Sequence, residues 1–181
     1  MQLQFRHTID VAPERAWSIF HGRIEHMAPE LPDVHQVRIL ERREPDRSRL
    51  EQDLAWAIDQ RVIPHSARPF IGDQLRELLS TLYWNHESRT VDFRFYHLQL
   101  PGLFDCRGQA DLAEAADGTH IRISADLDIQ PHLLPGVPRW LGRSVQPAVR
   151  RVVERTLGRI LDALPHAVAR ISHEGPSSRV G

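Results

Sequence analysis

The feature that most constrains the fold of this chain is a series of strand pairs separated by turns and followed by one long helical segment. The last pair is the clearest, because apolar and polar residues alternate over 104–112 and again over 121–129, with Asp117-Gly118 between them. Alternation with a period of two is typical of half-buried strands, and Asp-Gly is a preferred dipeptide in two-residue hairpin turns. Sequential hairpins predict a mostly antiparallel sheet.

The same alternation predicts the remaining strands. They are expected at 2–9, 34–44, 50–58, 77–84 and 91–97. The segment 77–84 also fits a helical spacing, but the turn-like residues 85–88 lead directly into the next alternating run and favour a second hairpin. Between the first two strands, Pro13 begins a short helix over 13–20, and a broken helical or loop segment follows over 21–32. The segment 64–73 is expected to be a loop or short helix, and the sequence does not decide whether it is a lid.

After Pro131 the periodicity becomes helical, and a helix is predicted over 140–171. Its apolar stripe consists of Leu141, Val145, Val149, Val152, Val153, Thr156, Ile160 and Leu164. Such a helix must lay this stripe across the sheet, and Pro147 is expected to kink or divide it. The length of 181 residues suits a single domain over 1–171 with a polar, frayed tail at 172–181.

Composition excludes several kinds of chemistry. All 23 basic residues are arginine, so a Schiff-base lysine and a P-loop lysine are both excluded. The single cysteine, Cys106, cannot form an internal disulfide, which fits a reducing compartment. The N-terminus lacks the pattern of a signal peptide and no apolar run approaches the ~20 residues of a membrane span. We therefore expect a soluble, cytoplasmic protein.

Several local phrases accompany this order of elements. They are residues 11–17 (VAPERAW), 31–34 (LPDV), 88–93 (SRTVDF), 117–119 (DGT) and Pro135-Gly136. With the strand and helix order, they resemble the START-like helix-grip (SRPBCC) superfamily over about residues 1–170. This superfamily contains birch-pollen-allergen-type proteins, polyketide aromatase/cyclases and coenzyme Q-binding proteins. The resemblance implies an α+β fold, in which a curved antiparallel sheet of six or seven strands grips the C-terminal helix.

The resemblance also implies a hydrophobic cavity between the sheet and the helix. The alternation supports it, because large aromatic residues on two hairpins face Cys106, Gly108, Ala110 and Ala125 on the third. The alternative is that the terminal helix and Trp140 fill this space. The residues expected to line the ligand site are Trp56, Ile58, Tyr83, Phe93, Phe95, His97, Cys106, Ala125, Trp140, Val149 and Val153.

Polar residues that interrupt the inward-facing apolar registers are the candidates for orienting a ligand. His97 and Tyr83 are the candidate acid/base groups, and His7 and Gln52 are further candidates for hydrogen bonding. The alternative for both histidines is a structural role at a strand end. By alternation, Arg107 faces outward, which argues against its polarising a substrate carbonyl.

Other functional motifs are missing from the sequence. The histidine spacings do not match a metal site, so no metal is expected, and neither a nucleophile elbow nor a dinucleotide-binding glycine motif is present. Cys106 on an inward register is expected to be a small buried apolar residue and not a thiolate. No cofactor is therefore predicted.

The predicted helix concentrates positive charge on a near-neutral chain. Residues 139–170 hold seven arginines against two acidic residues. Arg150, Arg151, Arg155 and Arg159 lie opposite the apolar stripe at 100° per residue. They form either a solvated face or a surface that docks on an anionic membrane or an acidic protein. Nucleic acid is not an expected partner, because no aromatic residues alternate with these arginines and the pI is near neutral.

These observations favour a non-catalytic or weakly catalytic protein that binds a hydrophobic small molecule, such as a lipid, a quinone or a polyketide-like compound. One alternative is a polyketide cyclase or dehydratase that uses His97 or Tyr83 as acid and base. A second is an interaction module that docks through the arginine face of the helix. The sequence does not identify the ligand or the oligomeric state.

Overall fold

The computed structural model describes residues 1–59, 61, 76–97, 102–130 and 139–173. Within the last segment, the side chains of 139–146, 148 and 149 are outside the description. The expected loop at 64–73 and the Pro135-Gly136 phrase also lie outside the described residues.

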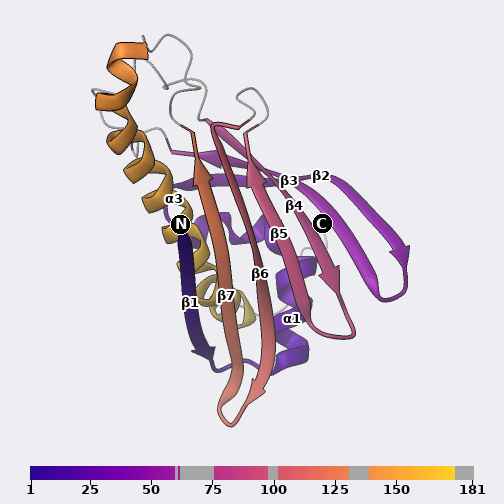
Figure 1. Ribbon diagram of the computed structural model, residues 1–181. Helices are drawn as coiled ribbons and strands as arrows, with labels where there is room; N and C mark the ends of the chain where they lie inside the picture. The colour runs from indigo at the N-terminus through magenta and orange to yellow at the C-terminus, as the bar shows by residue number, and fades with distance from the viewer. Residues whose placement is uncertain (60, 62–75, 98–101, 131–138, 174–181) are drawn as a thin grey trace, which may run out of the picture.

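Seven strands form a single antiparallel sheet, as the alternation predicted (Figure 1). The elements are β1 (Gln2–Ile9), α1 (Pro13–Gly22), the 3-10 helix η1 (Ile24–Glu30), β2 (Val34–Asp46), β3 (Arg49–Ile58), β4 (Glu77–Asn85), β5 (Thr90–Tyr96), β6 (Phe104–Ala115), β7 (Gly118–Ile129) and α3 (Arg139–His173). Their order in the sheet is β1-β7-β6-β5-β4-β3-β2, so β1 and β2 are the edge strands. The strand predicted over 77–84 is confirmed as β4.

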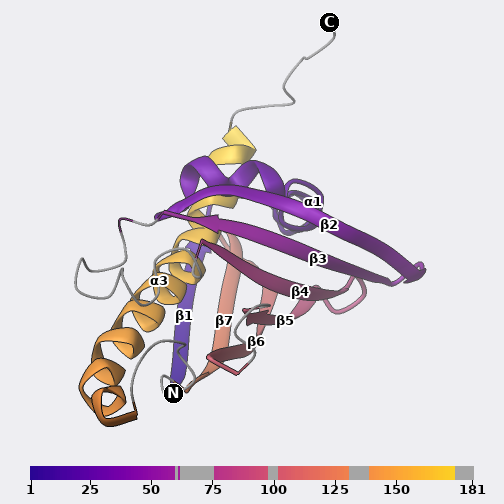
Figure 2. The same cartoon turned by 90° about the horizontal axis from the view of Figure 1, so that it is seen from above.

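The sheet is curved, and α3 runs along its open side next to β1 (Figure 2). The helix packs against α1, η1, β1 and β7, so the two short elements after β1 close one end of the space between sheet and helix. This is the helix-grip arrangement that the resemblance to the START-like superfamily implied. Among the described residues, no helix is long and apolar enough to cross a membrane.

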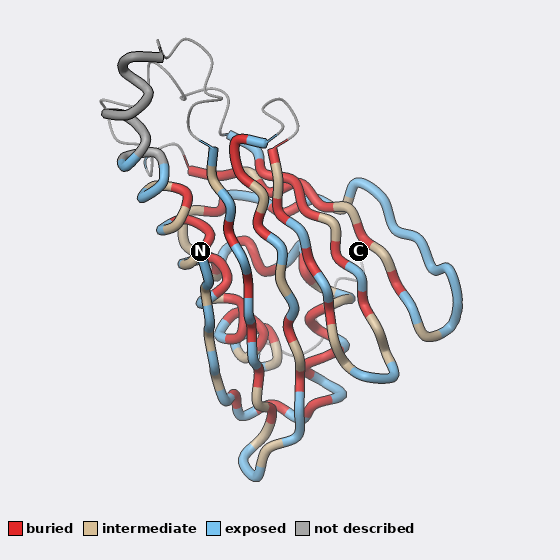
Figure 3. The backbone as a smooth tube through the Cα atoms, viewed as in Figure 1, coloured by how far each residue is buried: buried red, intermediate tan, exposed pale blue. Residues whose placement is uncertain are grey.

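Burial follows the alternation along each strand, so that one face of the sheet forms the core (Figure 3). On β7, for example, Ile121, Ile123 and Ala125 are buried, whereas the intervening residues are exposed. The opposite face is held by ion pairs, such as Arg94 to Asp105 at 2.9 Å. Arg107 also contacts Asp105 on this outer face, which confirms its predicted orientation.

The C-terminal helix differs from the prediction in two respects. It is continuous from Arg139 to His173, so Pro147 does not divide it, and the kink that was the other expected effect stays a prediction. A proline removes one backbone hydrogen bond, and the helix continues where the neighbouring turns are retained. The helix also ends two residues beyond the predicted boundary at 171, and the tail after His173 lies outside the described residues.

Candidate functional site

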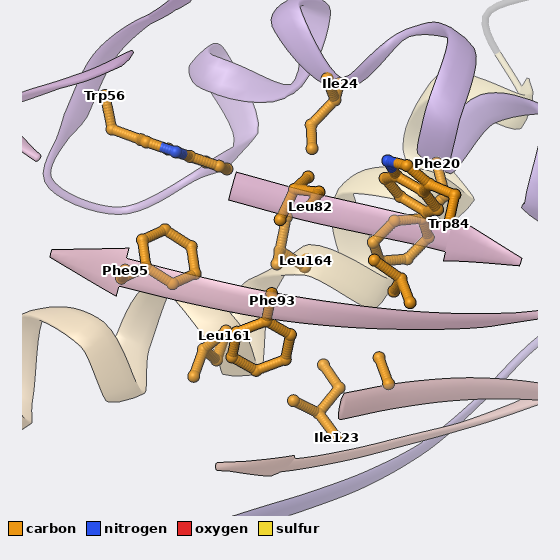
Figure 4. A pocket seen from close by; sticks show the side chains of 12 residues that line it. Phe20, Ile24, Trp56, Leu82, Trp84, Phe93, Phe95, Ile123, Leu161 and Leu164 are labelled. Carbon is orange, nitrogen blue, oxygen red and sulfur yellow. The ribbon is translucent and has the colours of Figure 1, made fainter. Parts of the chain in front are cut away.

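An apolar cavity lies between the concave face of the sheet and the helices (Figure 4). Its walls come from α1, η1, five strands and α3. The lining residues are Phe20, Ile24, Trp56, Leu82, Trp84, Val91, Phe93, Phe95, Ala110, Ile123, Leu161 and Leu164. The only side-chain polar atoms among them are the two indole nitrogens, so the cavity suits an apolar ligand.

The two tryptophans lie at opposite ends of the cavity (Figure 4). Trp56 lies opposite Leu78 in the β3–β4 pair and Trp84 lies opposite Leu50, so six residues separate them along the strands. This corresponds to about 20 Å at the usual rise of a strand. At the Trp56 end of the cavity, the indole Nε1 of Trp56 donates to Ser80 Oγ at 2.8 Å. The Trp56 ring packs on Phe95 with a centroid distance of 5.4 Å.

The aromatic residues occupy part of the space that the small residues of β6 leave. Phe93 lies opposite Gly108 in the β5–β6 pair, and a Cβ built at Gly108 would lie 2.5 Å from the Phe93 ring. Phe95 lies opposite Cys106 in the same register. The predicted arrangement of large residues over small ones is therefore present, but the rings fill much of the space.

The remaining free volume is small. It is about 30 Å³, which is enough for roughly two water molecules. A cavity that encloses a drug-sized ligand has about 300–1,000 Å³. Leu161 and Leu164 of α3 form one wall, so a larger ligand requires these side chains, or the helix that carries them, to move away from the sheet.

Most of the described residues predicted to line the site are buried in the core between the sheet and α3. Trp56, Phe93 and Phe95 line the cavity itself. Four further residues, namely Ile58, Cys106, Ala125 and Val153, belong to the surrounding core. The side chains of Trp140 and Val149 lie outside the described residues, so the placement predicted for them stays a prediction.

Tyr83 is not in the cavity, and this prediction is wrong. Its neighbours Leu82 and Trp84 are buried, so alternation along β4 places Tyr83 on the opposite face, where it is 50% exposed. It borders a surface hollow with Pro45 and Arg49. A hydroxyl on this face cannot reach a ligand held between the sheet and α3, so Tyr83 is withdrawn as an acid/base candidate.

The other polar candidates have different environments. His97 follows β5 in the register of Phe95, is buried, and has an interaction of its own. The ring of His7 on β1 contacts α3, since its Nε2 lies 3.0 Å from Asp162 Oδ1 and its ring packs on His166. Gln52 is fully buried on the concave face of β3. Of the four polar candidates, His97 and Gln52 are buried on this face.

The Cys106 thiol is buried, and burial raises its pKa to about 12. It is therefore protonated at neutral pH, in agreement with the prediction that this residue acts as a small apolar group.

We expect Cys106 in the folded protein at pH 8 to react with iodoacetamide at least 100-fold more slowly than in the protein unfolded in guanidinium chloride. The physical reason is that alkylation requires both a thiolate and access to the sulfur. Mass spectrometry of timed samples measures the two rates. Equal rates in the folded and unfolded protein would contradict the assignment of a buried, protonated thiol.

Two of the four arginines on the predicted basic face of α3 form ion pairs. Arg150 pairs with Glu154 within the helix, and Arg159 pairs with Asp33, the residue before β2, at 2.7 Å. In the described part of the chain, Arg151 and Arg155 are exposed and form no ion pair. All four arginines stay exposed, so the docking surface stays a prediction.

Sequence reasoning missed several cavity residues. Those absent from the predicted site are Phe20, Ile24, Leu82, Trp84, Val91, Ala110, Ile123, Leu161 and Leu164. Val91, Ala110 and Ile123 could have been included by extending the alternation, since each shares a register with a predicted residue of its own strand, namely Phe93, Cys106 and Ala125. Ile24 and Leu161 could not have been found from the sequence, because a helical pattern does not indicate which part of a buried stripe borders a cavity.

A curved sheet gripping a helix around an apolar cavity is the architecture of a hydrophobic-ligand-binding class of proteins. The sequence model of the family described as "Polyketide cyclase / dehydrase and lipid transport" matches residues 2–168. The chain belongs to this family. A comparison with curated proteins finds no match.

Solved structures share the fold at low sequence identity. The protein TTHA0849 from Thermus thermophilus is 15% identical with a TM-score of 0.63, over 95% of this chain and 99% of that one. The Zhui aromatase/cyclase from a Streptomyces species is 15% identical with a TM-score of 0.62, over 97% and 98%. A START superfamily protein from Mycobacterium smegmatis is 16% identical with a TM-score of 0.52, over 94% and 98%. At these identities the likeness extends to the fold alone.

Proposed function

We propose that this protein binds a hydrophobic small molecule, of the size of a lipid tail, a quinone or a polyketide-like compound, between the sheet and α3. The observation that carries the proposal is the cavity lined by apolar and aromatic side chains from every layer of the fold. Burial of apolar ligand surface would supply the affinity, at about 25 cal/mol per Å². The small free volume means that binding is coupled to displacement of the Leu161 and Leu164 side chains or of α3.

A cyclase or dehydratase activity has less support. Such chemistry needs a general acid or base within hydrogen-bond reach of the reacting atom. None of the described residues that line the cavity is titratable, and Tyr83 lies on the other face. The similarity to an aromatase/cyclase under 20% identity supports the fold but no catalytic role for His97.

Filling the cavity from the sheet tests the proposal. Ala110 is buried on β6 and lines the cavity, so Ala110→Val adds two carbon atoms to a free volume of about 30 Å³. We expect at least a tenfold loss of affinity for any lipid or quinone that the native protein retains, measured by native mass spectrometry with a panel of both classes. The same change at Ala113, which is exposed on the same strand, is the matched control and should leave the affinity unchanged.

Two outcomes would contradict the proposal. One is that the native protein retains no member of the panel. The other is that Ala113→Val weakens binding as much as Ala110→Val, which would place the ligand outside the cavity.

A further inference from the structure

Near the Trp84 end of the cavity, three side chains have a buried polar atom without a partner. Trp84 lines the cavity, whereas Gln52 and the half-buried His21 lie beside it. Among the described residues, the buried side-chain atoms that make no hydrogen bond are Trp84 Nε1, Gln52 Oε1 and His21 Nδ1. Gln52 is 0% exposed and Trp84 is 2% exposed. A buried polar group without a partner costs about 1–3 kcal/mol, so three in one protein need an explanation.

The three side chains belong to one neighbourhood. Gln52 Nε2 donates to the backbone oxygen of His21 at 3.1 Å, and the rings of His21 and Trp84 are 6.1 Å apart. Gln52 lies opposite Leu82 in the β3–β4 pair, so it shares a sheet face with Trp84, two residues further along β4. The last turn of α1 therefore meets two neighbouring strands at the place where these atoms lie.

The orientation of the Gln52 amide follows from its one hydrogen bond. A carbonyl oxygen only accepts, so the amide nitrogen must face the His21 oxygen, and Oε1 is the free acceptor. Trp84 Nε1 is a donor only. The cluster therefore offers one donor, one acceptor and one imidazole nitrogen that can serve as either.

Two other indoles, those of Trp17 and Trp56, have hydrogen-bond partners, so the free indole donor lies at the Trp84 end of the cavity. Trp17 Nε1 donates to His86 Nδ1 at 2.9 Å. Both of these rings lie within 6 Å of the His21 ring, so a partner is available to an indole in this neighbourhood. At the far end of the cavity, Trp56 donates to Ser80. Of the two tryptophans that line the cavity, only Trp84 has a free donor in the described structure.

The cluster is electrically neutral. Burial lowers the pKa of His21, and the nearby His86 and Arg42 lower it further, so the imidazole is uncharged at neutral pH. The tryptophan and the glutamine carry no charge. A carboxylate or phosphate would be unfavourable here, because the three side chains offer it no charge and the nearby guanidinium of Arg42 is already paired with Glu44 at 3.0 Å.

We propose that Trp84, Gln52 and His21 form a polar subsite that binds the hydroxyl group of an otherwise apolar ligand. The proposal deepens the function proposed above and rests on it. A hydroxyl oxygen accepts from Trp84 Nε1 while its proton is donated to Gln52 Oε1 or His21 Nδ1, so one group satisfies a donor and an acceptor together. A carbonyl, which only accepts, would leave Gln52 Oε1 without a partner. The ligand class is thus a phenol or alcohol with its hydroxyl near Trp84 and its apolar body directed toward Trp56.

A matched pair of probes tests the subsite. Naphthalene and 2-naphthol have the same ring system and differ by one hydroxyl. We expect the native protein to bind 2-naphthol about tenfold more tightly than naphthalene, measured by isothermal titration or by tryptophan fluorescence. The variants Trp84→Phe and Gln52→Met should each remove most of this preference. The preference is measured as the ratio of the two affinities within each variant, so that a change in packing that affects both probes alike cancels.

The outcomes distinguish the subsite from the cavity. Equal affinity of the native protein for the two probes would overturn the subsite and leave the proposed function intact. Failure of both probes to bind would overturn the subsite together with the cavity-binding function. A preference for 2-naphthol that survives in both variants would place the hydroxyl elsewhere and also overturn the subsite.

A second measurement needs only the native fold. In a ¹H–¹⁵N spectrum, the indole resonance of Trp84 should move downfield by at least 0.3 ppm in ¹H with 2-naphthol and much less with naphthalene. The Trp56 indole, which already donates to Ser80, serves as the internal control. Equal shifts of the Trp84 indole with the two probes would contradict the proposal even if the variants fail to fold.

Discussion

Replacing Gly108 with alanine is expected to lower the free energy of unfolding by about 3 kcal/mol, the upper part of the range for overpacking a core. A Cβ at this position would lie 2.3 Å from the backbone oxygen of Ser124 on β7 and 2.5 Å from the Phe93 ring on β5. The ring could turn, but the Ser124 oxygen belongs to the neighbouring strand. Relief of that contact requires the β6–β7 pair to shift.

Chemical denaturation measures this effect, and Gly22→Ala is the matched control. Gly22 ends α1, and nothing lies within 4 Å of a Cβ built there. The control should be neutral or stabilise the protein by up to about 1 kcal/mol, because alanine reduces the entropy of the unfolded chain and favours helix. A loss under 0.5 kcal/mol for Gly108→Ala would show that the Phe93 ring is not packed over bare backbone.

The architecture could be predicted from the sequence because its signals are local. Alternation over 104–112 and 121–129 together with the Asp117-Gly118 turn specifies β6 and β7 within a few residues. Each strand is adjacent to its hairpin partner in the chain, so the sheet order needs no long-range information except for β1. The helical period of the last segment likewise indicates α3 without knowledge of what it covers.

The error at Tyr83 has a physical cause in the composition of β4. Apolar residues occupy both faces of this strand, since Leu78 and Leu82 lie on one face and Leu79 on the other. The alternation along β4 is therefore weak. The register is imposed by the two neighbours, because Leu82 lies opposite Gln52 on β3 and Phe93 on β5. The pairing buries Leu82 and therefore exposes Tyr83, and no local feature of β4 specifies that pairing.

The candidate subsite and the ion pairs of α3 depend on contacts between distant segments. His21, Gln52 and Trp84 come from three elements, and each has an ordinary sequence context. The pairing of Arg159 with Asp33 likewise connects residues 126 positions apart. Periodicity places each side chain on a face of its own element, but which faces meet is decided by the packing of the whole domain.

Truncating Leu161 to alanine is expected to destabilise the protein strongly and to improve the binding of apolar probes. Leu161 is 1% exposed on α3 and forms a wall of the cavity. Leucine-to-alanine changes in cores cost about 3–5 kcal/mol, because apolar contacts are lost and a cavity remains. For a domain of this length, a change of 3 kcal/mol lowers the Tm by about 10 °C. Leu40→Ala, at a residue that is 52% exposed on β2, is the matched control and should change the stability by less than about 0.5 kcal/mol.

The same variant distinguishes a ligand cavity from a well-packed core. If the ligand displaces Leu161, truncation of this side chain removes part of the free energy needed to open the cavity. Naphthalene should therefore bind the variant at least tenfold more tightly than the native protein. A ligand that binds only the folded state stabilises it by mass action, so saturating naphthalene should restore several degrees of the lost Tm. A rise in Tm that is larger in Leu161→Ala than in Leu40→Ala would locate the probe beside α3. Equal affinity of naphthalene for the variant and the native protein would show that the ligand does not occupy the space next to Leu161.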